Sequence, residues 1–234
     1  MVKDKKTLLL IDSFALIFRA YYAFPASLRS PNGEPTNAVY GFTSILLDVI
    51  TKFKPHNVIA VFDSAGPTFR KTEHSFYKAN REEADDLLKA QIPMVRSLLE
   101  SFSRPVLSVE GYEADDIIAT IDKRHSGEWA QTIIVTGDQD IFQLVDNDTS
   151  GYLSGKRFAD AKWYGEQESK EKLGIYPSQV IDFKALKGDP SDNIPGVKGI
   201  GGKTAVELLE KYGSFDQIYS NIDAVSGSLK DKLV

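Results

Sequence analysis

The stretch QTIIVTGD, residues 131–138, is a short run of apolar and β-branched residues that ends in a carboxylate. Three other segments have the same apolar character: TLLLID (7–12), NVIAVFD (57–63) and RPVLSVEG (104–111). These runs are continuous rather than alternating, as in parallel strands that are covered on both faces. They therefore predict the strands of a parallel sheet.

Helical patterns separate these four segments. Apolar residues recur at steps of three and four between 36 and 53, and again between 84 and 102 around the polar Gln91. Pro93 should kink the second helix or divide it. Strands that alternate with helices predict an α/β fold, with a mostly parallel central sheet flanked by helices and joined by right-handed crossovers.

The composition excludes several kinds of protein. The 234 residues include no cysteine, which excludes disulfides and thiolate metal sites. The apolar run near the start is too short for a signal peptide core or a membrane span, so we expect a soluble cytoplasmic protein without membrane contact. The formal net charge of −5 argues against a nucleic-acid binder, unless acids gathered at one site leave a basic surface elsewhere.

Acids follow directly on the predicted strands, and two more lie in the turn GDPSDN. Ligands of open α/β sheets gather at the carboxyl ends of the strands, so we expect these acids to meet at one edge. In a helix that starts near residue 113, Glu113 and Asp116 share a face. In an extended chain, Asp138 and Asp140 point the same way. The nine carboxylates are Asp12, Asp63, Glu113, Asp115, Asp116, Asp138, Asp140, Asp189 and Asp192.

So many carboxylates cannot stay ionised at close range without cations. Two unit charges 4 Å apart repel by about 4 kcal/mol at an effective dielectric constant of about 20. Oxygen ligands suit Mg²⁺ or Mn²⁺, and two such ions form the usual clamp for attack on a phosphodiester. For any single acid the alternative is a helix cap, which is a common role for Asp after a strand.

The stretch GIGGKTA, residues 199–205, resembles a nucleotide-binding phosphate loop but departs from that pattern. Val197 stands where the first glycine of that loop should be, and no predicted strand leads into it. We expect instead a glycine turn that opens a helix, whose backbone N–H groups bind a nucleic-acid phosphate. A plain turn between helices is the alternative. The residues expected to contact nucleic acid here are Lys198, Gly199, Gly201, Lys203 and Thr204.

Residues 64–83 interrupt the alternation of strands and helices with a polar segment, SAGPTFRKTEHSFYKANREE. We interpret it as an exposed insertion. Its cations could bind backbone phosphates, and Tyr77 could stack on a base. A solvated charged loop is the alternative, and this segment considered alone favours that alternative.

Seven motifs then identify a family by their order. They are LLLIDSFALIFRAYYAFP, YGF, VFDSAGPTFR, YKANR, GYEADDIIAT, TGDQD and LKGDPSDNIPGVKGIGGKTA. Together they resemble the 5′-nuclease domain at the N-terminus of bacterial DNA polymerase I, of the flap-endonuclease superfamily. The resemblance implies a two-metal nuclease with a PIN-like core that removes 5′ flaps and primer RNA from branched or nicked DNA in replication and repair.

The resemblance also implies roles for individual residues. The nine acids match its metal ligands, Lys78 and Arg81 match the cations that steer the scissile phosphate, and Tyr77 and Arg70 match substrate contacts. It implies a nuclease core over 1–185, with a helical arch at about 64–95. It implies a helix–two-turn–helix region over 186–234 that grips duplex DNA, where backbone carbonyls also hold a potassium ion.

The chain departs from the family pattern in three places. Ser13 replaces the usual glycine after the first Asp, and Gln139 replaces a common lysine. Neither change removes a carboxylate of the expected metal site, so we expect the two changes to alter the tuning of that site only. The chain stops within an amphipathic pattern where family domains generally continue, and in polymerase I a polymerase follows. A stand-alone nuclease and a piece of a longer protein both fit this ending, and a missing tail would weaken duplex binding. We expect a monomer.

Three rival functions make different demands on the sequence. A PIN-type RNase would share the acidic edge, but we would not expect it to carry GVKGIGGKTA or the insertion. A silent module that only binds branched DNA would be expected to lose acids, and all nine are present. A phosphatase of the haloacid dehalogenase type requires a second Asp two residues after Asp12, where Phe14 stands.

Overall fold

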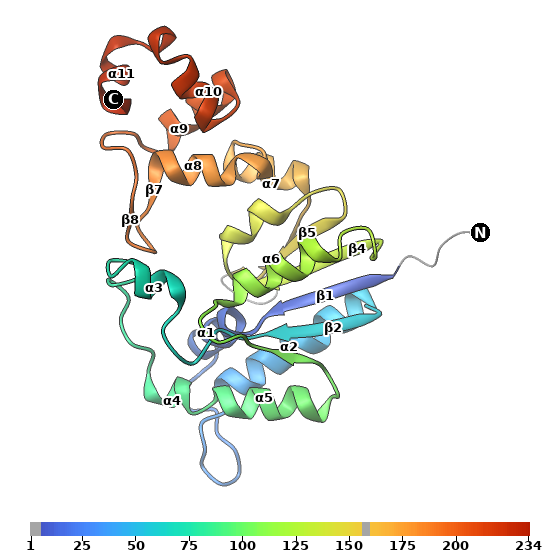
Figure 1. Ribbon diagram of the computed structural model, residues 1–234. Helices are drawn as coiled ribbons and strands as arrows, with labels where there is room; N and C mark the ends of the chain where they lie inside the picture. The colour runs from blue at the N-terminus through green and yellow to red at the C-terminus, as the bar shows by residue number, and fades with distance from the viewer. Residues whose placement is uncertain (1–5, 156–159) are drawn as a thin grey trace, which may run out of the picture. The chain divides into compact units, whose positions relative to one another are not determined.

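The computed structural model describes residues 6–155 and 160–234, and these form two compact units. The α/β unit comprises Met1–Thr68 and Glu83–Gly165, and the helical unit comprises Phe69–Glu82 and Glu166–Val234. Figure 1 traces the elements of both along the chain.

The α/β unit is built on a six-stranded sheet in the order β3-β2-β1-β4-β5-β6. Neighbouring strands are parallel from β3 to β5, and β6 pairs antiparallel with β5. This confirms the predicted mostly parallel sheet. The strands are β1 (Thr7–Asp12), β2 (Asn57–Val61), β3 (Val106–Leu107), β4 (Gln131–Thr136), β5 (Thr149–Leu153) and β6 (Lys162–Tyr164).

Two features of this sheet differ from the expectation. The strand expected over 104–111 pairs only at Val106 and Leu107. The strands β5 and β6 were not predicted, because TSGYL and KWY are too short and too polar to give an apolar run. Pairing with β4, rather than local sequence, makes TSGYL a strand.

Helices cover both faces of this sheet, as the continuous apolar runs require. Leu9 and Ile11 of β1 belong to one core cluster with residues of α1, α2 and α5. Leu8 and Leu10 are equally buried and point to the opposite face, where α6 contacts β1 and β2. The helices are α1 (Ser13–Ala23), α2 (Asn37–Phe53), α4 (Asp86–Lys89), α5 (Ile92–Ser101), α6 (Ala114–Arg124) and the 3₁₀ helix η1 (Gln139–Leu144).

Gln91 explains the polar position in the pattern of residues 84–102. The predicted long helix is divided into α4 and α5, and Pro93 lies in the first turn of α5. Gln91 sits between them, fully buried. Its Oε1 accepts from the backbone N–H of Ala38 at 2.8 Å, and its Nε2 donates to Asn37 Oδ1 at 2.9 Å. The side chain therefore caps the start of α2, which no local pattern could indicate.

The helical unit consists of short helices and one hairpin. Helices α8, α9 and α10 pack on one another around Leu208, Leu209 and Ile218. Its elements are α3 (Phe69–Glu73), α7 (Glu166–Leu173), η3 (Pro177–Gln179), α8 (Val180–Lys187), β7 (Gly188–Asp189), β8 (Ile194–Pro195), α9 (Gly202–Tyr212), α10 (Phe215–Ser220), η4 (Ile222–Ala224) and α11 (Gly227–Leu233).

Two glycines allow the β7–β8 hairpin to close. Gly188 pairs with Pro195 in the ladder and has a φ of 80°, a conformation that side chains rarely adopt. A β carbon on Gly196 would lie against the backbone of Lys187 and Gly188. Because both obstacles are backbone atoms, they cannot move aside cheaply. The hairpin that carries Asp189 therefore depends on glycine at both positions.

The division into units falls at other residues than the expected functional boundary. Residues 166–185 and 69–82 associate with the helical unit, whereas the nuclease core was expected to run from 1 to 185. The expected division, with an arch at about 64–95, stays a prediction. Across residues 6–155 and 160–234, no helix combines the length and the apolar composition needed to cross a membrane.

Candidate metal centre

Acids of the α/β unit lie where three adjacent strands end. Asp12 is the last residue of β1, Asp63 follows β2, and Asp138 follows β4. The strands β2, β1 and β4 are neighbours and run parallel, so their carboxyl ends lie at one edge of the sheet. This is the edge at which the sequence analysis placed the acids.

A threonine that the sequence analysis did not select joins two of these acids. The hydroxyl of Thr136 donates to Asp12 Oδ2 at 2.6 Å and accepts from the backbone N–H of Asp138 at 3.0 Å. Asp12 also caps α1 by accepting from the N–H of Ala15 at 3.2 Å. Thr136 therefore fixes the carboxylate of β1 relative to the loop after β4. Its place at the end of a strand, just ahead of an acid, was the available signal.

Asp12 lies in surroundings that disfavour its charge. Burial raises the pKa of Asp12 to about 7, and the nearby negative charges of Asp63 and Asp115 add to the rise. Hydrogen bonds from Thr136 and Ala15 work in the opposite direction but are outweighed. At neutral pH this carboxyl would be ionised fully only beside an added positive charge.

The acids around the start of α6 form a hydrogen-bonded cap. Glu113 is the N-cap residue, and its backbone N–H donates to Asp116 Oδ2 at 3.1 Å. Asp63 Oδ1 accepts from the N–H of Ala114 at 3.0 Å, which ties the end of β2 to this helix. Glu113 is buried, and Asp115 is exposed. Helix capping and cation binding are thus compatible uses of one cluster, since each carboxylate has two oxygens.

The prediction that Asp138 and Asp140 lie in an extended chain was wrong, although both acids belong to the same loop. The chain is not extended there: η1 begins at Gln139, and Asp138 is its N-cap. Asp138 Oδ1 accepts from the backbone N–H of Asp140 at 3.0 Å. The two side chains are related by a helix cap rather than by the period of a strand.

The donor set of the α/β unit fits hard divalent cations. Carboxylates and one hydroxyl supply oxygen only, and the chain has no cysteine. The raised pKa of Asp12 identifies a place where a cation would relieve both burial and repulsion from Asp63 and Asp115. Such chemistry suits a divalent cation that accepts oxygen ligands.

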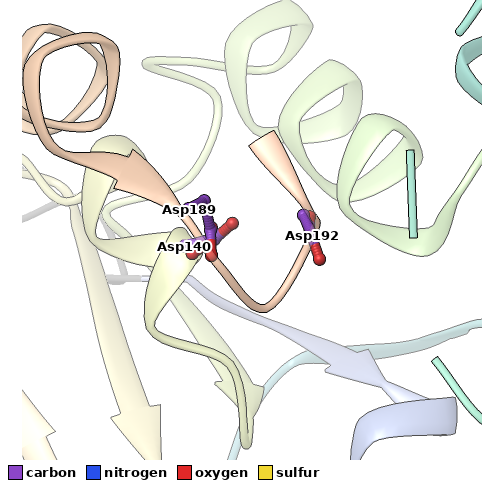
Figure 2. Close-up of side chains that lie close together, drawn as sticks. All are labelled: Asp140, Asp189 and Asp192. Carbon is purple, nitrogen blue, oxygen red and sulfur yellow. The ribbon is translucent and has the colours of Figure 1, made fainter. Parts of the chain in front are cut away.

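The helical unit carries its two candidate acids on the β7–β8 hairpin, where Asp189 ends β7 and Asp192 lies in the turn. Figure 2 labels both acids on this hairpin. Asp189 Oδ2 accepts from Lys184 Nζ at 2.6 Å, and Asp189 Oδ1 accepts from the Ser191 hydroxyl at 2.6 Å. Burial acts to raise the pKa of Asp189, but these hydrogen bonds outweigh it and lower the pKa to about 2. Asp189 is therefore ionised without any added metal.

Asp192 contacts two residues that the sequence analysis placed on the substrate. Arg81 Nη2 donates to Asp192 Oδ1 at 2.5 Å, and the Tyr77 hydroxyl donates to Asp192 Oδ2 at 3.2 Å. Tyr77 is only 5% exposed, so its ring is closed to a stacking base in this conformation. The expected stacking role stays a prediction and requires the segment around Tyr77 to open.

The other expected substrate residues lie on the same unit. Lys78 has a φ of 53°, and its Nζ lies 5.0 Å from the centre of the Tyr77 ring. Arg70 lies on α3, and its guanidinium lies 4.7 Å from the centre of the Phe69 ring. Their roles toward substrate stay predictions.

The glycine turn before α9 has the geometry of an anion site. Gly199 has a φ of 82°, and Gly201 is the N-cap of α9 without a side-chain cap. Lys198 and Lys203 are exposed beside it, and Thr204 lies in the first turn of the helix. The first N–H groups of an uncapped helix are well placed for a phosphate. Phosphate binding at these residues stays a prediction.

The two departures from the family pattern differ in burial. Ser13 is fully buried, and its hydroxyl has no hydrogen-bond partner among the described residues. Gln139 is exposed in the first turn of η1. The unpaired hydroxyl of Ser13 therefore lowers the stability of the fold next to Asp12, whereas the exposed Gln139 can change without disturbing the core.

Comparisons with known proteins agree with this arrangement. Residues 7–174 match the family described as 5′-3′ exonuclease, N-terminal resolvase-like domain. Residues 175–234 match the family described as 5′-3′ exonuclease, C-terminal SAM fold. DNA polymerase I of Caldicellulosiruptor bescii is 42% identical over 228 residues, which are 97% of this chain and 27% of that protein. The chain thus spans about a quarter of that relative's length.

Solved structures share the fold at low identity. One is a bacteriophage T5 5′-exonuclease with bound zinc, with a TM-score of 0.76 and 23% identity over 97% of this chain and 84% of that one. Another is the bacteriophage T5 flap endonuclease in a pseudo-enzyme–product complex with DNA and metal ions. It has a TM-score of 0.75 and 22% identity over the same shares of the two chains. The core and its C-terminal helices are therefore those of this fold.

Proposed function

Because the chain belongs to the 5′-3′ exonuclease family, we propose that it is a metal-dependent, structure-specific nuclease that cuts 5′ flaps and 5′ ends of branched or nicked DNA, primer RNA included. The observation that carries this proposal is that Asp12, Asp63 and Asp138 lie where the neighbouring parallel strands β1, β2 and β4 end; burial, which raises the pKa of Asp12 to about 7, supports it. Carboxylates with this arrangement are typical of cation sites.

Two Mg²⁺ or Mn²⁺ ions are proposed to be held by the acids of the α/β unit together with Asp189 and Asp192. When bound, such ions lower the pKa of water and neutralise charge on a phosphodiester. The protein's own groups prepare for them: Thr136 and the Ala15 amide orient Asp12, and the Ala114 amide orients Asp63. These bonds hold carboxylates in place before any ion arrives, which reduces the reorganisation required at binding.

Substrate contacts are proposed for the helical unit. Lys78 and Arg81 would meet the scissile phosphate, with Arg70 and Tyr77 on the single strand. Lys198, Lys203, Thr204 and the amides after Gly199 and Gly201 would hold duplex phosphates. Support comes from the uncapped start of α9 and from the exposed lysines beside it. Such contacts release counterions, so DNA affinity should fall steeply as salt rises.

A potassium ion at the turn before α9 would add to duplex binding. Comparing the affinity for duplex DNA in K⁺ salts with that in tetramethylammonium salts tests this proposal.

We propose a monomer that acts on DNA in the cytoplasm, with a polymerase domain in the longer protein, as in the DNA polymerase I relatives. Light scattering of the purified chain tests the monomer.

A labelled 5′-flap duplex tests the main proposal. We expect cleavage near the junction in Mg²⁺, none in EDTA, and none with Asp115→Ala or Asp138→Ala. Unchanged cleavage by either variant would contradict the proposed mechanism. Tight flap binding without cleavage in Mg²⁺ or Mn²⁺ would instead identify a silent DNA-binding module. Preference for single-stranded RNA without a junction would identify a PIN-type RNase.

A further inference from the structure

The segment that carries Lys78 and Arg81 is bonded to the turn that carries Asp189 and Asp192, entirely within the helical unit. The backbone N–H of Lys78 donates to the carbonyl of Asp192 at 2.9 Å. Arg81 Nε donates to the carbonyl of Ser191 at 3.3 Å, in addition to its ion pair with Asp192. The expected substrate cations and the expected metal ligands thus form one connected group.

Two asparagines complete this connection from opposite sides. Asn193 Nδ2 donates to the carbonyl of Phe76 at 2.8 Å, and Asn80 Nδ2 donates to the carbonyl of Pro190 at 2.9 Å. Each asparagine therefore bonds the backbone of the other segment. Each side-chain amide donates to a backbone carbonyl of the other segment, so both asparagines are suited to hold the two segments in position.

The backbone of Asn193 explains why asparagine suits this position. Its φ is 58°, in the left-handed region that glycine and asparagine tolerate best. Glycine would also permit this conformation, but only asparagine can in addition donate to Phe76. Asn193 thus allows the turn after Asp192 and also bonds to the segment that carries Lys78 and Arg81.

We propose that Asn193, assisted by Asn80, is a positioning residue that holds Lys78 and Arg81 in register with the Asp189–Asp192 turn. This inference rests on the proposed nuclease function and adds a determinant of its rate. Its action passes through Lys78, because the bond to Phe76 anchors the chain two residues ahead of that lysine. Misplacing a catalytic group by about 1 Å can cost about 100-fold in rate.

Asn193→Gly is the decisive variant, because it keeps the left-handed backbone and removes only the side-chain bond. We expect kcat for a 5′-flap duplex to fall about tenfold or more, with the Kd for the same duplex in Ca²⁺ changed by less than about threefold. Asn221→Ala is the matched control. It removes a side-chain bond of equal length to a backbone carbonyl, from Nδ2 to Gln217, elsewhere in the same unit.

A double-mutant cycle with Lys78→Ala separates positioning from general stability. If Asn193 acts through Lys78, then Asn193→Gly should lower kcat in the wild-type background and have almost no further effect in the Lys78→Ala background. A purely structural role would lower kcat equally in both. Equal losses, or wild-type kcat for Asn193→Gly, would overturn the proposal.

Limited trypsin digestion of the metal-free chain tests the connection without using activity. We expect Asn193→Gly and Asn80→Ala each to speed cleavage after Lys78 and Arg81 about fivefold, the effect of one hydrogen bond on a local opening equilibrium. Asn221→Ala should not. Unchanged digestion of both asparagine variants would overturn the proposal. Failure of the wild-type chain to cut flap DNA would refute the nuclease function instead, and digestion would still decide whether the asparagines hold the segment.

Discussion

Asp12 of the α/β unit is partly buried and Asp189 of the helical unit is buried, yet their pKa values move in opposite directions. Burial raises the pKa of Asp12 to about 7, because its partners within the described chain are a hydroxyl and an amide. Burial acts on Asp189 as well, but Lys184 and Ser191 outweigh it and lower the pKa to about 2. The groups that shift the pKa of Asp12 include no cation, whereas Lys184 is the cation beside Asp189.

Replacing Asp12 should have the largest effect. Asp12→Asn keeps the shape of the side chain but removes the charge that a metal needs, so we expect single-turnover flap cleavage in Mg²⁺ to slow by about 1000-fold or more. Asp122→Asn is the matched control. Asp122 is a buried aspartate on α6 that also has a raised pKa, and it accepts from the Thr149 hydroxyl at 2.6 Å. Similar losses for both variants would mean that the rate depends on burial of any aspartate rather than on a metal ligand.

The stability of the metal-free protein should depend on pH through Asp12. A carboxyl whose pKa is raised on folding binds its proton more tightly in the folded state. The contribution of Asp12 to the free energy of unfolding is therefore complete below about pH 4. It falls by up to about 4 kcal/mol as pH rises through the raised pKa near 7. Unfolding in EDTA, followed by the fluorescence of Trp129 and Trp163 in the α/β unit, measures this.

Asp12→Asn should remove most of this dependence. The variant should be more stable than wild type at pH 8 in EDTA, and Mg²⁺ should raise the stability of wild type only. Parallel pH profiles for the two proteins would show that Asp12 is easily ionised, and the contrast with Asp189 would disappear.

The hairpin of the helical unit should fail when Gly196 gains a side chain. The β carbon in Gly196→Ala would meet backbone atoms of Lys187 and Gly188. We expect a loss of about 2–3 kcal/mol in the stability of the helical unit and slower flap cleavage, because Asp189 and Asp192 share this hairpin. Gly227→Ala is the control, since its β carbon would meet no atom within 4 Å. Amide hydrogen exchange in residues 166–234 measures the difference.

Removing the positive charge of Lys184 should raise the pKa of Asp189, as burial raises the pKa of Asp12. Lys184→Met should cost about 1 kcal/mol in the helical unit, since a charged hydrogen bond is lost. Because the pKa of Asp189 is lowered, its stabilisation is present above about pH 4 and is lost as pH falls toward 2. Acid unfolding of Lys184→Met should therefore be less steep in this window than that of wild type. NMR amide signals of α8 and α9 report this, and an unchanged acid transition would contradict it.

Ser13→Ala should give the smallest effect, a gain in stability. The buried Ser13 hydroxyl has no partner among the described residues, so its removal should stabilise the α/β unit by about 1 kcal/mol. Thermal unfolding followed by tryptophan fluorescence measures the gain. A loss of stability would show that a bound water satisfies the hydroxyl, and Asp12 would then have a more polar neighbour than its raised pKa suggests.

Local sequence was enough for the parallel strands, the main helices and the edge at which the acids gather. A strand covered on both faces has to be apolar throughout, so the segments at 7–12, 57–61 and 131–136 could be recognised without their neighbours. Parallel order then puts the acids that follow them at one edge. The family motifs added the residue types of the site, and the matches over 7–174 and 175–234 confirm that family.

Tertiary structure alone decided the surroundings of Asp12 and the partner of Asp192. The groups that lower the pKa of Asp189 to about 2, Lys184 and Ser191, lie five and two positions away in sequence, but nothing near Asp12 in sequence predicts the rise of its pKa to about 7. The difference arises from partners and from burial. Thr136 reaches Asp12 across 124 positions of sequence, and Arg81 reaches Asp192 across 111. Electrostatic energy depends on distance and on exclusion of water, and both are set only when the chain has folded.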